Sequence, residues 1–92
     1  MERLKNIIRN EKVGKCFYNL YDRWRDESDY EDINEYGKAI VNVIKQEFPD
    51  YEITLISSTK RPFGVKFKLY HAKVHLFVRI EKGNLILHCK WF

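Results

Sequence analysis

Acidic residues are scarce in the second half of this 92-residue chain, and the scarcity begins where the sequence changes its period. Residues 51–92 hold only two acids, Glu52 and Glu81, against eight Lys and Arg, whereas residues 1–50 hold eleven acids against nine. All three histidines also lie in the second half. The overall net charge of +4 therefore conceals an acidic half and a basic half, and the basic half favours an anionic partner.

Proline, glycine, cysteine and long apolar runs are also rare. Two prolines and four glycines form no linker, so we expect one domain over residues 1–92. Cys16 and Cys89 lack metal-ligand or CxxC spacing, which predicts reduced, buried thiols. No run reaches the ~18 apolar residues of a membrane span, and Met1–Asn10 lacks the apolar centre of a signal peptide. We expect a cytoplasmic protein with no membrane association, no metal site and no cofactor.

The first half places its apolar residues at helical spacing. One stripe, with a possible interruption near Asn10–Gly14, comprises Leu4, Ile7, Ile8, Val13, Cys16, Phe17, Leu20, Tyr21 and Trp24. Ser28-x-x-Glu31 and Asp32-x-x-Glu35 both resemble capping boxes that open a second helix. Its inward stripe comprises Ile33, Tyr36, Ile40, Ile44 and Phe48, and Pro49 ends it because proline cannot continue the hydrogen-bond ladder.

The second half alternates apolar and polar residues, as strands do. A first strand is predicted over Tyr51–Ser57 and a polar loop over Ser57–Pro62. A turn at His71-Ala72 would then pair Leu69 with Val74, Phe67 with Leu76 and Val65 with Val78. A turn at Lys82-Gly83 would pair Ile80 with Leu85, Val78 with Leu87, Leu76 with Cys89 and Val74 with Trp91. Both hairpins select the same inward residues, and a slip of one residue would reverse every face.

These patterns predict an α+β fold: two N-terminal helices packed on one face of a four-stranded antiparallel meander (ααββββ). The register then sets the other face of the sheet. It predicts one row of Lys66, Phe77 and His88, a second of Lys68, His75 and Lys90, a third of Tyr70, Lys73 and Phe92, and Arg79 beside Ile86. The loop residues Lys60 and Arg61 add two cations at one end.

Cations interleaved with aromatic rings are typical of surfaces that bind single-stranded nucleic acids, because the cations neutralise phosphates and the rings stack on bases. We therefore expect a non-enzymatic protein that binds RNA, single-stranded DNA or a nucleoprotein. The candidate binding residues are Lys60, Arg61, Lys66, Lys68, Tyr70, Lys73, His75, Phe77, Arg79, His88, Lys90 and Phe92.

Two other functions stay open. The first is a protein–protein interaction module, such as an inhibitor, adaptor or immunity-type protein, that docks through this face or through the C-terminal edge strand. Asn84–Phe92 would be that edge, and its unpaired backbone groups would also permit a homodimer.

The second alternative is enzymatic. The chain resembles small basic ribonuclease toxins of the RelE type in size and in the order of two helices before a basic antiparallel sheet. It differs from them in lacking an N-terminal strand and in having few arginines on its strands. The resemblance implies RNA cleavage in which Lys66, Lys68, His75, Arg79 and His88 hold phosphates or transfer protons, with Tyr70 nearby.

Overall fold

The computed structural model describes residues 2–27 and 33–92. Three helices, α1 (Glu2–Arg9), α2 (Glu11–Glu27) and α3 (Ile33–Glu47), precede four strands, β1 (Ile53–Lys60), β2 (Phe63–Leu69), β3 (Ala72–Glu81) and β4 (Asn84–Trp91). The strands form one antiparallel sheet in the order β1-β2-β3-β4. The predicted α+β class, the order of helices before strands and the antiparallel sheet are confirmed. No helix in the described ranges is long and apolar enough to cross a membrane.

The prediction of two helices is wrong by one, because the first apolar stripe is divided at Asn10. The Asn10 N–H donates to the Ile7 carbonyl at the end of α1 (3.2 Å), and the Asn10 side-chain oxygen accepts from the Val13 N–H (3.0 Å). That second bond is an N-cap of α2. The Asn10 side chain also donates to Glu47 at the end of α3 (3.1 Å), so a single residue ends one helix, begins the next and contacts the third.

The third helix ends at Glu47, just before Pro49, as the sequence predicts. The two capping boxes predicted to open it involve Ser28, Glu31 and Asp32, which lie outside the described residues. Gly37 faces β1 and β2: a Cβ at this position would overlap the Ser58 hydroxyl and lie 3.4 Å from Val65 Cγ2. Gly37 therefore permits the close approach of α3 to the sheet.

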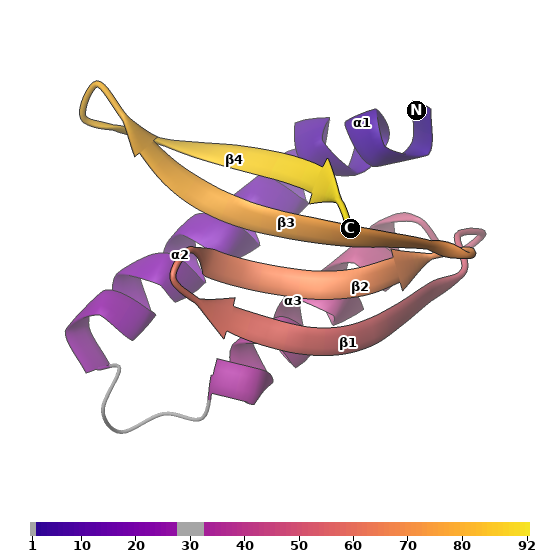
Figure 1. Ribbon diagram of the computed structural model, residues 1–92, viewed down its shortest axis with the longest axis horizontal. Coiled ribbons are helices and arrows are strands. Elements are labelled where there is room, and N and C mark those ends of the chain that lie inside the picture. The colour runs from indigo at the N-terminus through magenta and orange to yellow at the C-terminus, as the bar shows by residue number, and fades with distance from the viewer. Residues whose placement is uncertain (1, 28–32) are drawn as a thin grey trace.

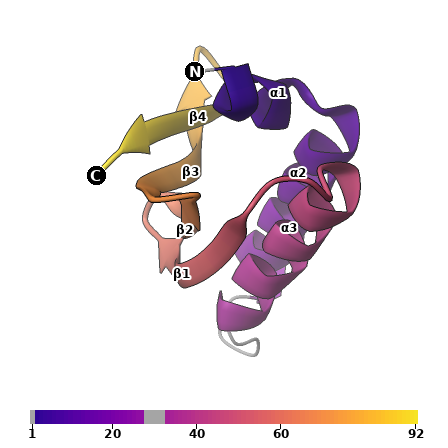
Figure 2. The same cartoon turned by 90° about the vertical axis from the view of Figure 1, so that its right-hand side faces the viewer.

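One hydrophobic cluster joins the helices to the sheet, and Figure 2 shows α2 and α3 together beside the strands. Its fully buried large side chains are Phe17, Phe67, Ile7, Ile40, Ile44, Leu76, Val13, Val65 and Val74. The ring of Phe63 lies at one end of the cluster, 6.3 Å from Phe17 and 5.8 Å from Tyr36 between centroids. Cys16 and Cys89 are free and only half-buried at its margin, and burial raises the pKa of both thiols.

The predicted β3–β4 hairpin is confirmed in its turn and in its register. Lys82 and Gly83 both have positive φ (51° and 80°), as a two-residue type I′ turn requires. The four predicted pairs, Ile80 with Leu85, Val78 with Leu87, Leu76 with Cys89 and Val74 with Trp91, all occur.

The predicted β2–β3 register is wrong by two residues. The turn is Tyr70-His71 instead of His71-Ala72, so Leu69 pairs with Ala72, Phe67 with Val74 and Val65 with Leu76. Tyr70 adopts a positive φ of 58°, and its N–H donates to the Glu52 carbonyl (2.8 Å). A shift of two residues changes the pairs but keeps every side chain on its predicted face.

The first strand also differs from its prediction. It begins at Ile53 instead of Tyr51 and continues through the residues predicted as a loop to Lys60, so that Arg61-Pro62 alone connects it to β2. An irregularity at Ile56 shifts the register, and Ser57, Ser58 and Thr59 then pair with Lys66, Val65 and Gly64. These short polar residues extend the ladder instead of ending it.

Leu76 lies at the centre of the cluster with no exposed surface, on the confirmed hairpin. We predict that Leu76→Ala lowers the free energy of unfolding by about 2–5 kcal/mol, because the substitution removes buried methyl groups and leaves a cavity. Ile80→Ala on the same strand is the control, since Ile80 is 64% exposed and its loss should be small. Equal denaturation midpoints for the two variants would contradict the described core.

Candidate nucleic-acid interface

The outer face of the sheet, opposite the shared core, collects nine of the twelve residues that the sequence predicts as binding residues. In Figure 1 the strands lie in front of the helices, so this face is toward the viewer. The nine are Lys66, Lys68, Lys73, His75, Phe77, Arg79, His88, Lys90 and Phe92. We call this set the basic face.

Three predicted residues do not join it. Tyr70 lies in the β2–β3 turn and packs on the core side of the sheet. The Arg3 guanidinium lies 4.4 Å from the centroid of its ring. Lys60 and Arg61 line a separate pocket of about 300 Å³ with Tyr21 and Trp24. Lys60 pairs with the inward residue Phe63, so the register places Lys60 on the core side of the sheet.

The corrected register sets the order of side chains across the basic face. Lys68 lies directly opposite Lys73, Lys66 opposite His75, and His75 opposite Lys90. Gly64 lies opposite Phe77, which in turn lies opposite His88. The predicted rows are thus correct between β3 and β4, whereas each β2 residue moves along by one row.

His75 is buried although it belongs to the outer face, with only 6% of its surface exposed. Its Nε2 lies 3.0 Å from the Thr59 hydroxyl oxygen, and that hydroxyl donates to the Pro62 carbonyl (2.7 Å). Since the single hydroxyl hydrogen is used by Pro62, Nε2 of His75 carries the hydrogen of their shared bond. Burial, and then the ammonium groups of Lys66 and Lys90, lower the pKa of His75.

Phe77 is also almost fully buried on this face, at 9% exposed. Its ring stacks on that of His88 (5.9 Å between centroids) and contacts that of His75 at a tilt of 39° (4.9 Å). The Lys90 ammonium lies 5.9 Å from the Phe77 ring centroid. Gly64 makes room for it: a Cβ there would lie 2.7 Å from Phe77 Cα and 2.8 Å from Phe77 Cβ. We call His75, Phe77 and His88 the outer cluster. A glycine inside a strand indicates such a close approach, and Gly64 is the sequence feature that could have identified this cluster.

Exposed groups surround this cluster. Phe92 is 52% exposed, and the Lys66 ammonium lies 5.0 Å from its ring centroid. Lys68, Lys73 and Lys90 are exposed. The ring available for stacking is therefore that of Phe92, since the ring of Phe77 is covered.

Glu81 points to the same side of the sheet as the basic face, at the end of β3 farthest from Lys68 and Lys73. Its carboxylate lies 3.9 Å from Arg79 and 3.2 Å from Nε2 of His88, the latter an ion pair only when His88 is protonated. Among the residues that the structure describes, none of Lys66, Lys68, Lys73 and Lys90 forms a salt bridge. The positive charge is thus uncompensated at the Phe92 end.

Of the residues named for a ribonuclease of the RelE type, the sheet brings Lys66, Lys68, Arg79 and His88 onto one side, and the other two lie elsewhere or are covered. His75 is covered and hydrogen-bonded, and Tyr70 lies on the opposite side of the sheet. The described residues also contain no group of three or more His, Cys, Asp or Glu placed to hold a metal ion. No family model matches the chain, and comparisons with curated proteins and with solved structures found no similar protein.

The lowered pKa of His75 predicts a pH-dependent stability. The unfolded chain takes up this proton near pH 6.5 and the folded chain only at lower pH, so protonation favours unfolding. The stabilisation is complete above about pH 6.5 and is lost as the pH falls toward the folded-state pKa.

We predict that lowering the pH from about 7.5 to about 5.5 reduces the free energy of unfolding of His75→Gln by less than that of wild type. The substitution keeps an N–H for Thr59, and urea denaturation measures the free energy at each pH. The control is His71→Gln, which changes an exposed histidine in the β2–β3 turn and leaves the contact of His75 with Thr59 in place. An equal loss of stability in wild type and His75→Gln would contradict the described environment of His75.

Proposed function

We propose that this protein binds RNA or single-stranded DNA, free or in a nucleoprotein, through the basic face and without catalysis. The observation that carries the proposal is the group of four uncompensated lysines beside one exposed aromatic ring, Phe92. Phosphates would bind Lys66, Lys68, Lys73 and Lys90, and a base would stack on Phe92.

The pairing of Lys68 with Lys73 supports this reading. Like charges directly opposite each other across two antiparallel strands destabilise a sheet by a few tenths of a kcal/mol. The unfavourable pair becomes favourable when a phosphate binds between the two ammonium groups. A surface serving only solubility would gain more from alternating charges.

A cytoplasmic location accords with this function, and the free cysteines accord with a reducing compartment. In the predicted fold the helices cover the face opposite the lysines. This arrangement would leave the basic face open to a partner.

We predict that replacing Lys68 and Lys90 with Ala weakens binding of a single-stranded RNA and makes the slope of log K against log salt shallower by about 1–2 units. The matched control replaces Lys15 and Lys45, which lie on α2 and α3, and removes the same charge. Fluorescence anisotropy of a labelled oligonucleotide over a salt series measures both. No binding by wild type at ~50 mM salt, or equal effects of the two double variants, would refute the proposal.

A second candidate, a protein interface at the β4 edge, has its own observation. Of the large hydrophobic residues exposed in the described ranges, most lie on β3 and β4 or just after them: Ile80, Ile86, Trp91 and Phe92. The Phe92 N–H donates to Lys73 O (3.1 Å), so the even-numbered β4 residues face β3. The N–H groups of Leu85, Leu87, Cys89 and Trp91 then point away from the sheet and can receive another strand.

This second candidate predicts a homodimer or strand addition by a protein partner. Light scattering at ~100 µM should then give the mass of a dimer, and Leu87→Pro should abolish it, because proline removes an outward N–H that β3 does not use. A monomer whose Leu85, Leu87 and Cys89 amides exchange rapidly with solvent would exclude self-pairing at this edge.

A further inference from the structure

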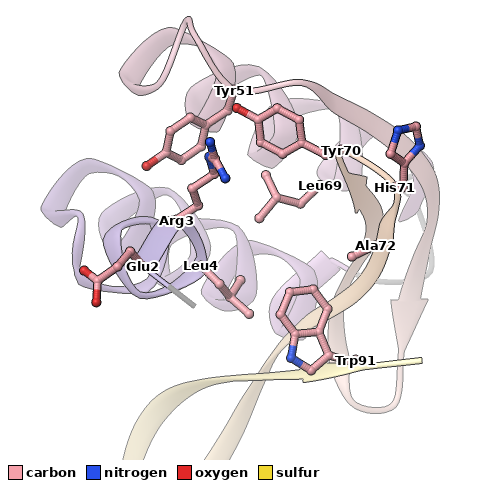
Figure 3. Close-up of a pocket in the computed structure, with 9 residues that line it drawn as sticks. All are labelled: Glu2, Arg3, Leu4, Tyr51, Leu69, Tyr70, His71, Ala72 and Trp91. Atoms are coloured by element: carbon pink, nitrogen blue, oxygen red, sulfur yellow. The ribbon is translucent and has the colours of Figure 1, made fainter.

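A pocket of about 670 Å³ lies at the end of the sheet where α1, the α3–β1 connection, the β2–β3 turn and the end of β4 meet. Its size is within the ~300–1,000 Å³ typical of small-molecule sites. Figure 3 shows the lining residues, which are Glu2, Arg3, Leu4, Tyr51, Leu69, Tyr70, His71, Ala72 and Trp91.

The floor of this pocket is apolar, and it lies on the side of the sheet opposite the basic face. Leu69 and Trp91 are core-side residues of their strands, and Leu4 projects toward them from α1 (Figure 3). Trp91 is 42% exposed although its register position points to the core side. Its indole is thus a partly exposed wall of the pocket, and it provides apolar area for a ligand.

Arg3 provides a cation among the residues that line the pocket. Its guanidinium lies 4.4 Å from the Tyr70 ring centroid and 6.0 Å from that of Tyr51 (Figure 3). Stacking on a ring uses the flat face of the guanidinium and leaves its in-plane N–H donors free. Within the described residues Arg3 forms no salt bridge, although Glu2 is also at the rim.

The two tyrosines that hold Arg3 are themselves fixed. The Asn6 side chain donates to the Tyr51 hydroxyl (3.2 Å), and the Tyr51 ring stacks on Phe48 at 4.8 Å. The Tyr70 hydroxyl donates to the Asp50 carbonyl (3.3 Å). The cation is therefore held in place before any ligand arrives, which reduces the entropy lost on binding.

We propose that this pocket binds an amphipathic carboxylate, with its carboxylate on the Arg3 guanidinium and its apolar body against Leu4, Leu69 and Trp91. Arg and carboxylate match as a bidentate pair. A nucleobase fits less well, because Leu4, Leu69, Ala72 and Trp91 offer few hydrogen-bond partners to its edges. The site is separate from the basic face and does not depend on the proposed nucleic-acid binding.

Three probe molecules test the two halves of the site: octanoate, octanol with the same body but no charge, and acetate with the charge but no body. Calorimetry measures the binding of each probe. A change in Trp91 fluorescence, with Trp91→Phe as the blank, shows that the probe binds next to Trp91. We expect octanoate to bind with a Kd below ~1 mM, and we expect the Kd of each of the other two probes to be about tenfold or more higher. Absence of octanoate binding at that concentration, or octanol binding as tightly, would overturn the proposal.

Variants place the ligand in the pocket. Arg3→Gln should weaken the binding of octanoate about tenfold or more and leave the binding of octanol unchanged. Arg9→Gln makes the same charge change at the exposed end of α1 and should alter the affinity for neither probe. Ala72→Leu should weaken octanoate by filling the pocket. Circular dichroism and RNA binding should be unchanged in Arg3→Gln, so loss of octanoate binding in a folded, RNA-binding variant cannot come from unfolding. Equal octanoate affinity in wild type, Arg3→Gln and Ala72→Leu would refute the site.

Discussion

The burial of β3 on both of its faces is the constraint on which the rest of the structure depends. Five consecutive residues, Val74–Val78, are buried, although alternate side chains of a strand point to opposite sides. Val74, Leu76 and Val78 join the core shared with the helices. His75 and Phe77 are buried on the outer side, beneath side chains of the neighbouring strands.

The outer cluster explains how a face rich in lysine keeps a defined shape. Lys66 and Lys90 extend over the rings of Phe92 and Phe77, so their apolar stems cover the cluster while their ammonium groups remain at the surface. Thr59 holds His75 from β1. Lysines anchored in this way would offer a bound phosphate fixed contact points, so less side-chain entropy would be lost in the proposed binding.

The sequence predicts the class of fold and most of the basic face because both follow from local rules. The Lys82-Gly83 turn needs two positive φ values, which a glycine makes accessible, and it alone sets the β3–β4 register. The β2–β3 turn has no glycine, and the contacts of Tyr70 with Arg3, Asp50 and Glu52 come from distant parts of the chain. Because the error is an even number of residues, the β2 lysines keep their face.

Other features could not be predicted from periodicity. The residues Ser57–Thr59 have the composition of a loop, yet they extend β1 because Gly37 leaves room for Ser58 and because His75 binds Thr59. Phe77 and His75 alternate out of the core and so suggest free binding groups, whereas their burial arises from Gly64 and from neighbours on two other strands. Arg3 lies in the acidic half and contacts residues about 50 and 70 positions away, so no local pattern identifies its pocket.

The proposed function requires that the basic face, and no other surface, contacts single-stranded nucleic acid. The most direct measurement is a titration of isotope-labelled protein with a short single-stranded RNA, followed by amide and lysine side-chain chemical shifts. Saturable, salt-sensitive shifts are expected at Lys66, Lys68, Lys73, Lys90 and Phe92, with α2 and α3 unchanged. Shifts confined to the helices, or none at low salt, would contradict the proposed function.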